Sequence, residues 1–412
     1  MKTVSKFPVV SALSIAISSI AGASFASASV DEITTALTNG KAYGDFRLRY
    51  EGVEQDNAAD DANATTLRTR LGYTTGTYEG FSTTIEFEDS RVVAGQDEYD
   101  IPGFARPADY TSKGASVIAD QETTELDQGF LQYKYQTFTA KLGRQILTYD
   151  NHRYVGHVGW RQDRQTFDAV SFQYAPIKNL ELNYAYLDQR NRIFGEEADI
   201  DSKDHLINMS YKTAIGKLSS YAYLLEETVS EKSYDTYGIR LSGSKEIGSI
   251  KALYSAEYAY QKYENGANTL ESNYMLLEGG AVISGITAKV GYEVLGSKDG
   301  NYAFSTPLAT LHKFNGWTDQ FLNTPSQGLE DLYLKVSGKL AGGKVVVAYH
   351  DFSADESSAT VDDLGSEIDI LYARKFGKNY SAGLKYGSYS AGDAASGKVD
   401  TDKVWFWLGA KF

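Results

Sequence analysis

Hydrophobic and polar residues alternate with period two along most of this chain. The segment 250–261 places Ile250, Tyr254 and Tyr258 on one face and Lys251 and Glu257 on the other. Successive side chains of a β-strand point to opposite faces, so this alternation predicts a strand with one apolar and one polar face. Helical spacing never persists for three turns. The pattern therefore predicts an all-β protein.

The same test predicts about 18 strands. They are expected near residues 43–51, 65–75, 80–91, 125–136, 137–147, 166–175, 179–190, 203–214, 216–227, 233–245, 248–262, 271–283, 284–295, 328–340, 342–353, 366–377, 378–390 and 402–412. A propeller or solenoid would repeat a motif at a fixed period, and no such repeat occurs. A secreted sandwich would not carry an apolar face over nearly every strand. We therefore expect one closed sheet.

The connections between these strands alternate in length. Short turns such as 175–178 and 284–285 follow even-numbered strands, whereas the long loops follow odd-numbered ones, at 52–64, 92–124, 148–165, 296–327, 354–365 and 391–401. Short turns at one rim and long loops at the other are typical of transmembrane antiparallel β-barrels of the bacterial outer membrane. An even strand count also places both ends of the barrel on the short-turn, periplasmic side.

The first 28 residues read as a secretory signal peptide. Lys2 and Lys6 precede an apolar stretch, and Ala26-Ser27-Ala28 provides a small-residue cleavage site. A short N-terminal membrane helix is the alternative, which the scattered serines disfavour. We expect residues 1–28 to be removed and residues 29–412 to form a single barrel domain. About 14 residues separate Ala28 from Tyr43, too few for the plug domain of a gated transporter.

The final segment, 402–412, alternates up to the terminal Phe412. A terminal aromatic residue on such a strand resembles the tail that the outer-membrane barrel insertion machinery recognises. Phe412 is therefore the expected insertion signal. The expected location is the bacterial outer membrane, with its lipid and lipopolysaccharide as partners.

Composition narrows the functional classes. The 412 residues include 40 Lys and Arg against 54 Asp and Glu, a net charge of −14, which disfavours nucleic-acid binding. Cysteine is absent, which excludes disulfides and thiolate metal sites. A barrel of about 18 strands encloses a water-filled lumen, so a channel for passive diffusion is the expected function. Such a channel needs no cofactor.

Charges of both signs fall on the polar face that would line this lumen. The expected channel-lining cations on the strands are Arg47, Arg49, Arg68, Arg70, Arg240 and Lys289, beside inward acids such as Glu86, Glu88 and Glu257. Opposite charges on facing walls tune ion selectivity. The outer segments 52–64 and 354–365 are acidic; they either bind divalent cations that bridge lipopolysaccharide or are simply solvated loops.

One long connection is rich in basic and aromatic side chains. Residues 143–170 contain two histidines, His152 and His157, together with the aromatic and basic residues Arg144, Arg153, Tyr154, Trp160, Arg161 and Arg164. If this segment folds inward, its guanidinium groups can bind carboxylates or phosphates through forked hydrogen bonds. We expect Arg144, Arg153, Arg161 and Arg164, with Arg68 and Arg70, to form an electropositive constriction.

The same segment resembles the alginate-export family of outer-membrane barrels. The resemblance rests on a GRQ strand end, a VGWRQ stretch and a QTFDA strand start, and it reaches Gly143, Arg144, Gln145, Gly156, Trp160, Arg161, Gln165, Thr166, Phe167 and Asp168. It implies an 18-stranded barrel whose arginine-bearing constriction serves anionic polysaccharide or other anionic solutes. The favoured function is an outer-membrane porin for small hydrophilic, anionic solutes.

Three alternatives remain at this stage. A plugged exporter of anionic polysaccharide, or a surface-binding barrel that uses loops 92–124 and 296–327, would share the same strands. An enzyme would need a catalytic group, and no G-x-S-x-G motif occurs. Only Asp150 with His152, or His157 with Asp163, offers an acid–base pair, so we expect no enzyme. A monomer and a homotrimer are both compatible with the sequence.

Overall fold

The computed structural model describes residues 30–412, so the expected signal peptide lies outside the described residues. Eighteen antiparallel strands form one sheet. They are β1 (Lys41–Gln55), β2 (Ala62–Thr74), β3 (Phe81–Ala94), β4 (Thr123–Tyr135), β5 (Phe138–Gln145), β6 (Thr166–Tyr174), β7 (Leu180–Asn191), β8 (Ile200–Thr213), β9 (Gly216–Glu226), β10 (Lys232–Ile247), β11 (Ile250–Asn265), β12 (Asn268–Ile283), β13 (Ile286–Leu295), β16 (Leu329–Leu340), β17 (Gly343–Ser353), β18 (Asp363–Phe376), β19 (Tyr380–Ser390) and β20 (Thr401–Lys411).

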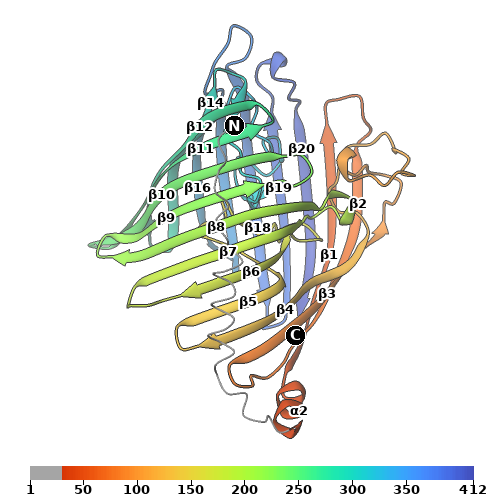
Figure 1. Cartoon of the computed structure of the whole chain (residues 1–412). Coiled ribbons are helices and arrows are strands. Elements are labelled where there is room, and N and C mark those ends of the chain that lie inside the picture. The colour runs from red at the N-terminus through yellow and green to blue at the C-terminus, as the bar shows by residue number, and fades with distance from the viewer. Residues whose placement is uncertain (1–29) are drawn as a thin grey trace.

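The sheet closes into a barrel because its first and last strands pair with each other. β1 runs antiparallel to β20 with Leu48 opposite Leu408, and Gly44 exchanges two backbone hydrogen bonds of 3.0 Å with Phe412. The C-terminus and helix α2 (Val30–Thr38) lie at the same end of the barrel (Figure 1). The long loops lie at the opposite rim, which confirms the predicted asymmetry of the connections.

The predicted all-β barrel of 18 strands is confirmed, with strand ends displaced by a few residues. Several small elements were not predicted. They are the nine-residue helix α2, a two-stranded sheet of β14 (Ser297–Lys298) and β15 (Tyr302–Ala303), and four 3-10 turns, η1 (Gly103–Ala105), η2 (Glu196–Ala198), η3 (Leu311–Lys313) and η4 (Ala394–Ser396). Each is too short for a sequence period to reveal.

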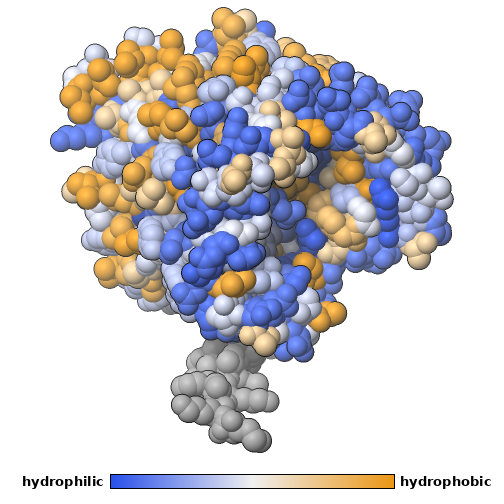
Figure 2. Space-filling model, turned by 90° about the horizontal axis from the view of Figure 1, so that it is seen from above, coloured by the Kyte–Doolittle hydropathy of each residue, from blue (hydrophilic) through white to orange (hydrophobic). Residues whose placement is uncertain are grey.

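Burial is the reverse of that in a soluble domain. On β3, Phe87 is 57% exposed while its neighbour Glu88 is 0% exposed, and on β2 Leu71 is 51% exposed while Arg70 is 4% exposed. Apolar side chains thus cover the outside of the wall, and charged ones fill the inside, as expected where lipid surrounds the sheet. Seen from above, hydrophobic residues gather on an outer flank and hydrophilic residues cover the centre (Figure 2). Within residues 30–412, no helix is long and apolar enough to cross a membrane.

Candidate functional site: the inner loops of the barrel

Two long loops turn into the lumen and join there. The first inner loop (residues 146–165) connects β5 to β6, and the second inner loop (residues 296–328) connects β13 to β16. Val155 pairs with Leu308 in a parallel bridge, and the Gly156 N–H donates to the Leu308 carbonyl at 2.8 Å. The Thr310 N–H donates to the His152 carbonyl at 3.0 Å. Because both loops bond to each other and to the wall, they act as one structural unit.

The GRQ and QTFDA motifs lie at the two ends of the first inner loop and fix its attachment to the barrel wall. Gly143 has φ +120°, and a Cβ there would lie 2.3 Å from the Gly129 carbonyl oxygen, so only glycine fits. Arg144 on β5 lies opposite Asp168 on β6 and donates two hydrogen bonds to its carboxylate, at 2.8 and 3.1 Å. The Gln145 amide donates to the Ala169 carbonyl at 3.0 Å. The GRQ and QTFDA motifs therefore fix the points where the loop leaves and rejoins the sheet.

The GWRQ tip of this loop rests on β1 and β2. Arg47 donates to the backbone carbonyls of Gly159, Trp160 and Arg161, at 3.2, 2.7 and 2.5 Å, and to Oε1 of Gln162 at 3.0 Å. Among residues 30–412, no carboxylate pairs with Arg47. Its guanidinium instead supplies donors to backbone carbonyls that the irregular loop leaves unpaired.

Arg161 links the first inner loop to the wall and to the second inner loop. It donates to both Glu51 oxygens at 3.1 and 2.9 Å and to Asp319 at 2.9 Å. Its side chain is only 6% exposed. Arg49 lies beside it, paired with Asp120 of the loop between β3 and β4 and 3.3 Å from Glu51. These buried pairs bring three loops and β1 together.

Trp160 lies at the centre of an aromatic and cationic cluster. Its ring stacks on His312 of the second inner loop with centroids 5.0 Å apart, and it meets Trp405 and Trp407 of β20 edge-on at 5.8 and 5.5 Å. The Arg49 guanidinium carbon lies 5.0 Å and the Lys385 ammonium 4.4 Å from the Trp160 ring centroid. The cluster provides stacking and cation–π contacts at the loop junction.

His312 is held in one neutral tautomer by its neighbours. Its Nδ1 lies 2.7 Å from Asp319, which can only accept, and its Nε2 lies 2.6 Å from the Lys385 ammonium, which can only donate. Nδ1 therefore carries the proton. Burial, with the charges of Lys385 and Arg161, lowers the pKa of His312 to about 3 despite the neighbouring Asp319.

The other arginines of the expected constriction are also paired with carboxylates. Arg164 pairs with Glu86 and Asp127, Arg70 with Glu88, and Arg68 with Asp45 at 2.7 Å. Across the lumen, Arg153 pairs with Glu293 of β13 at 3.0 Å and donates to Asn315 at 3.0 Å. The pairs of Arg164 and Arg153 hold the first inner loop in place, and those of Arg68 and Arg70 join neighbouring strands of the wall, so most of this charge is neutralised locally.

The structure thus brings nine of the predicted lining residues together around the first inner loop and places the other two, Arg240 and Lys289, near Lys313 of the second inner loop. The nine are Arg47, Arg49, Arg68, Arg70, Arg144, Arg153, Trp160, Arg161 and Arg164. Arg240 pairs with Glu257 on β10 and β11, and Lys289 with Glu278 at 2.8 Å on β13 and β12. Asp120, Asp127 and Asp319, which pair with Arg49, Arg164 and Arg161, were not predicted, because no local sequence signal marks a carboxylate as facing an arginine.

A second cationic group lies around Lys313, a residue that was not predicted, and includes the predicted Arg240 and Lys289. The Lys313 ammonium donates to the Asn151 carbonyl at 2.7 Å, while part of the side chain remains exposed. Partial burial and the neighbouring cations Lys335, Arg240 and Lys289 lower its pKa. Ion pairs with carboxylates neutralise Arg240 and Lys289, whereas Lys313 and Lys335 have no such partner among residues 30–412. This group therefore has more cations than paired carboxylates.

On the outer side, the loops enclose a vestibule, a cavity of about 560 Å³. Phe104, Phe194 and Leu322 form part of its apolar wall, and Arg161 and Arg192 are among its cationic residues. The Arg192 guanidinium lies over Phe104 and Phe194, 5.2 and 4.9 Å from their ring centroids. Within residues 30–412, Arg192 has no ion pair with a carboxylate. The vestibule thus combines aromatic surface with a cation.

Neither acid–base pair considered from the sequence forms. The Asp150 carboxylate accepts hydrogen bonds from Lys217, Ser219 and Asn208 rather than from His152. His157 Nδ1 has no hydrogen-bond partner in the described part of the chain, and Asp163 lies beside two other carboxylates instead.

Comparison with known families identifies the chain. The profile of the alginate export family matches residues 43–294, which is more than half of the sequence. The chain belongs to the alginate export family. The match extends far beyond the motifs of residues 143–168 and confirms the family resemblance. No curated protein matches the sequence.

Solved structures of outer-membrane proteins share the fold of this family member. Pseudomonas aeruginosa OccK9 (OpdG) superimposes with a TM-score of 0.71 at 13% identity, over 92% of this chain and 99% of that chain. Acinetobacter baumannii OccAB4 gives 0.71 at 10% identity, with 92% and 99% covered. Pseudomonas aeruginosa OpdK, solved with vanillate, gives 0.69 at 12% identity, with 90% and 98% covered. The protein is an outer-membrane β-barrel of the porin fold, as predicted.

Proposed function

We propose that this alginate export family member is a diffusion channel for small anionic solutes, with the two inner loops as its constriction. The observation that carries the proposal is the Lys313 group, in which Lys313 and Lys335 have no carboxylate partner in the described chain. An excess of cations in a confined lumen raises the local concentration of anions. The paired arginines position the loops, and the unpaired cations act on the solute.

The vestibule supports small organic anions as the solute class. Its aromatic wall suits a planar apolar body, and Arg192 suits a carboxylate. OpdK, a fold neighbour, was solved with vanillate, an aromatic carboxylate. An aromatic carboxylate would fit a cavity of about 560 Å³, since ligand sites commonly have volumes of this order.

A second candidate function is a loop-plugged exporter of anionic polysaccharide. It is favoured by the bonding of the two inner loops to each other across the lumen, at Val155–Leu308 and Thr310–His152. In that case the loops would have to move before a polymer could pass. The two functions differ in the current that the resting protein conducts.

Single-channel recording in planar bilayers under a KCl gradient tests the proposal. We expect open channels whose reversal potential shows anion preference. Lys313→Gln and Lys335→Gln should each lower the anion-to-cation permeability ratio roughly fourfold. One charge about 10 Å from an ion in water contributes about 0.4 kcal/mol, which favours the anion and disfavours the cation by a factor of about two each. Lys378→Gln, which removes the same charge from an exposed turn, is the matched control.

Cation preference that neither lumenal lysine variant changes would overturn the anionic proposal and leave a general porin. Closed wild-type channels that conduct only after the loops are released would favour the plugged exporter. The proposal also includes export by residues 1–28 and recognition of Phe412 during insertion. Phe412 is 71% exposed and stacks on Phe46 at 5.6 Å, so its ring lies on the outer surface, where another protein can contact it.

A further inference from the structure

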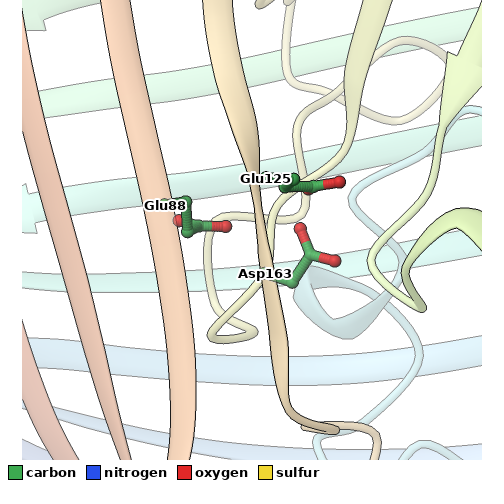
Figure 3. Close-up of side chains that lie close together, drawn as sticks. All are labelled: Glu88, Glu125 and Asp163. Atoms are coloured by element: carbon green, nitrogen blue, oxygen red, sulfur yellow. The ribbon is translucent and has the colours of Figure 1, made fainter.

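Three carboxylates converge where the first inner loop meets the wall. Glu88 on β3 lies opposite Glu125 on β4 in the sheet, and Asp163 approaches them from the loop. Ligand oxygens of all three lie within 4.8 Å of one another. Figure 3 shows the three side chains gathered around one point, with Asp163 directed towards Glu125. Like charges this close need a counter-charge or a shared proton.

Asp163 supplies an independent sign that a ligand belongs there. The residue is 2% exposed, and neither of its carboxylate oxygens accepts a hydrogen bond from an N–H or hydroxyl group within residues 30–412, so only the neighbouring carboxyl groups can share a proton with it. A buried carboxylate without a partner is costly, so native proteins rarely leave one in that state. Burial and the charges of Glu125 and Glu88 raise the pKa of Asp163 well above its usual range.

The surrounding charges do not balance. The ion pairs of this region come from Arg70 and Arg164, and they reach only Glu86, Glu88 and Asp127. Arg144 also acts on the charge of Glu125, but its own ion pair is with Asp168. Glu125 and Asp163 form no ion pair with any Lys, Arg or His in the described chain. The five carboxylates of this region are Glu86, Glu88, Glu125, Asp127 and Asp163. Two guanidinium groups cannot neutralise them, and a divalent cation would reduce the remaining excess.

The cluster can also be reached from outside. Glu125 is partly exposed and lines a cavity of about 680 Å³ among the outer loops, together with Asp97, Glu122, Glu196 and Glu197. Acidic walls concentrate cations near such an opening. An entry path and a set of three oxygen ligands are two requirements for a metal site.

We propose that Glu88, Glu125 and Asp163 bind a divalent cation of the calcium type, which ties the first inner loop to β3 and β4. Carboxylate oxygens are the ligands that Ca²⁺ prefers, and two oxygens on one Ca²⁺ can lie up to about 5 Å apart. Water or other oxygens would complete its coordination shell. This site is separate from the Lys313 group and does not depend on which solute the channel conducts.

Calcium binding to the purified mature barrel in detergent micelles tests the site directly. Equilibrium dialysis with ⁴⁵Ca²⁺ should show one more bound ion per chain in the wild type than in Asp163→Asn, or an affinity at least about tenfold higher. Glu125→Gln, a change at a partly exposed position, should have the same effect even if Asp163→Asn folds poorly. Glu246→Gln, at an exposed position of β10, is the matched control and should leave this binding unchanged.

Amide exchange provides the second measurement. Chelation with EDTA should speed exchange of residues 156–165 in the wild type and leave it unchanged in Glu125→Gln. Equal calcium binding by the wild type and both cluster variants would overturn the site. So would an absence of binding at millimolar Ca²⁺, which would assign the cluster to carboxyl groups that share protons. Anion preference in bilayers is measured separately, so either proposal can fail without the other.

Discussion

Replacement of Arg161 by alanine should release the first inner loop while the barrel stays folded. The Arg161 side chain is 6% exposed and makes three hydrogen bonds to two carboxylates, Glu51 on β1 and Asp319 on the second inner loop. Its removal breaks the contacts of the first inner loop with the barrel wall and with the second inner loop at the same time. The strands themselves keep their ladder hydrogen bonds, so the expected effect is local.

The magnitude follows from what the two carboxylates retain. Breaking a buried ion pair from one side typically costs 3–5 kcal/mol. Glu51 keeps Arg49 at 3.3 Å, and Asp319 keeps His312 at 2.7 Å and Lys403 at 3.5 Å, so we expect the low end, about 3 kcal/mol. Since each 1.36 kcal/mol corresponds to a factor of ten, the undocked loop should become roughly 100-fold more populated.

Hydrogen–deuterium exchange of the folded barrel measures this population directly. Peptides that cover residues 156–165 should exchange roughly 100-fold faster in Arg161→Ala, while peptides from β10 to β12 keep wild-type rates. Arg161→Lys should lie in between, because one ammonium lacks the fork that reaches both carboxylates. Arg91→Ala is the control: its ion pair with Asp89 is half exposed and contributes about 0.2–1 kcal/mol.

Unchanged protection of residues 156–165 in Arg161→Ala would refute this reasoning, because it would mean that the remaining contacts hold the loop without Arg161. Faster exchange over the whole chain would refute it in a different way, since Arg161 would then support the barrel rather than the loop.

Three further predictions use other contacts of the site. Trp160→Ala removes the stack on His312 and should cost about 3 kcal/mol of loop docking, detected as new trypsin cleavage within residues 153–164 that the wild type resists. Gly143→Ala forces a Cβ against a carbonyl oxygen at positive φ and should lower the unfolding temperature measured by gel mobility after heating, whereas Gly103→Ala, with open space around its Cβ, should not. Because burial depresses the pKa of His312 from 6.5 to about 3, the undocked loop binds the proton more readily. Loop docking should therefore be strongest above pH 6.5 and weaken as pH falls towards 3, measured by exchange of residues 156–165 corrected for intrinsic rates; His312→Gln should flatten this dependence, and an equally steep dependence in that variant would exclude His312 as its cause.

The sequence predicted the wall of this protein far better than its interior. Each strand can be predicted from its own residues, because the alternation of apolar and polar side chains is a local pattern. Phe87 and Glu88 face opposite sides of the wall because lipid lies on one side and water on the other. The same pattern predicted which cations point inward, such as Arg49 and Arg70. It could not predict that Asp120, Asp127 and Asp319 neutralise cations of this region, because these partners lie far along the chain, Asp120 and Asp319 in loops and Asp127 on β4.

What the sequence by itself determined was therefore the strand count, the asymmetric rims, the family and the position of a basic segment in one long loop. Only the tertiary structure decided which charged side chains form ion pairs and which remain unpaired in the lumen. Arg161 is occupied by two carboxylates, whereas Lys313 and Lys335 have none within the described residues, and Asp163 meets Glu88 and Glu125 instead of a base. The physical reason is that strand periodicity is set by neighbours along the chain, while the pairing of buried charges depends on distances across the closed barrel.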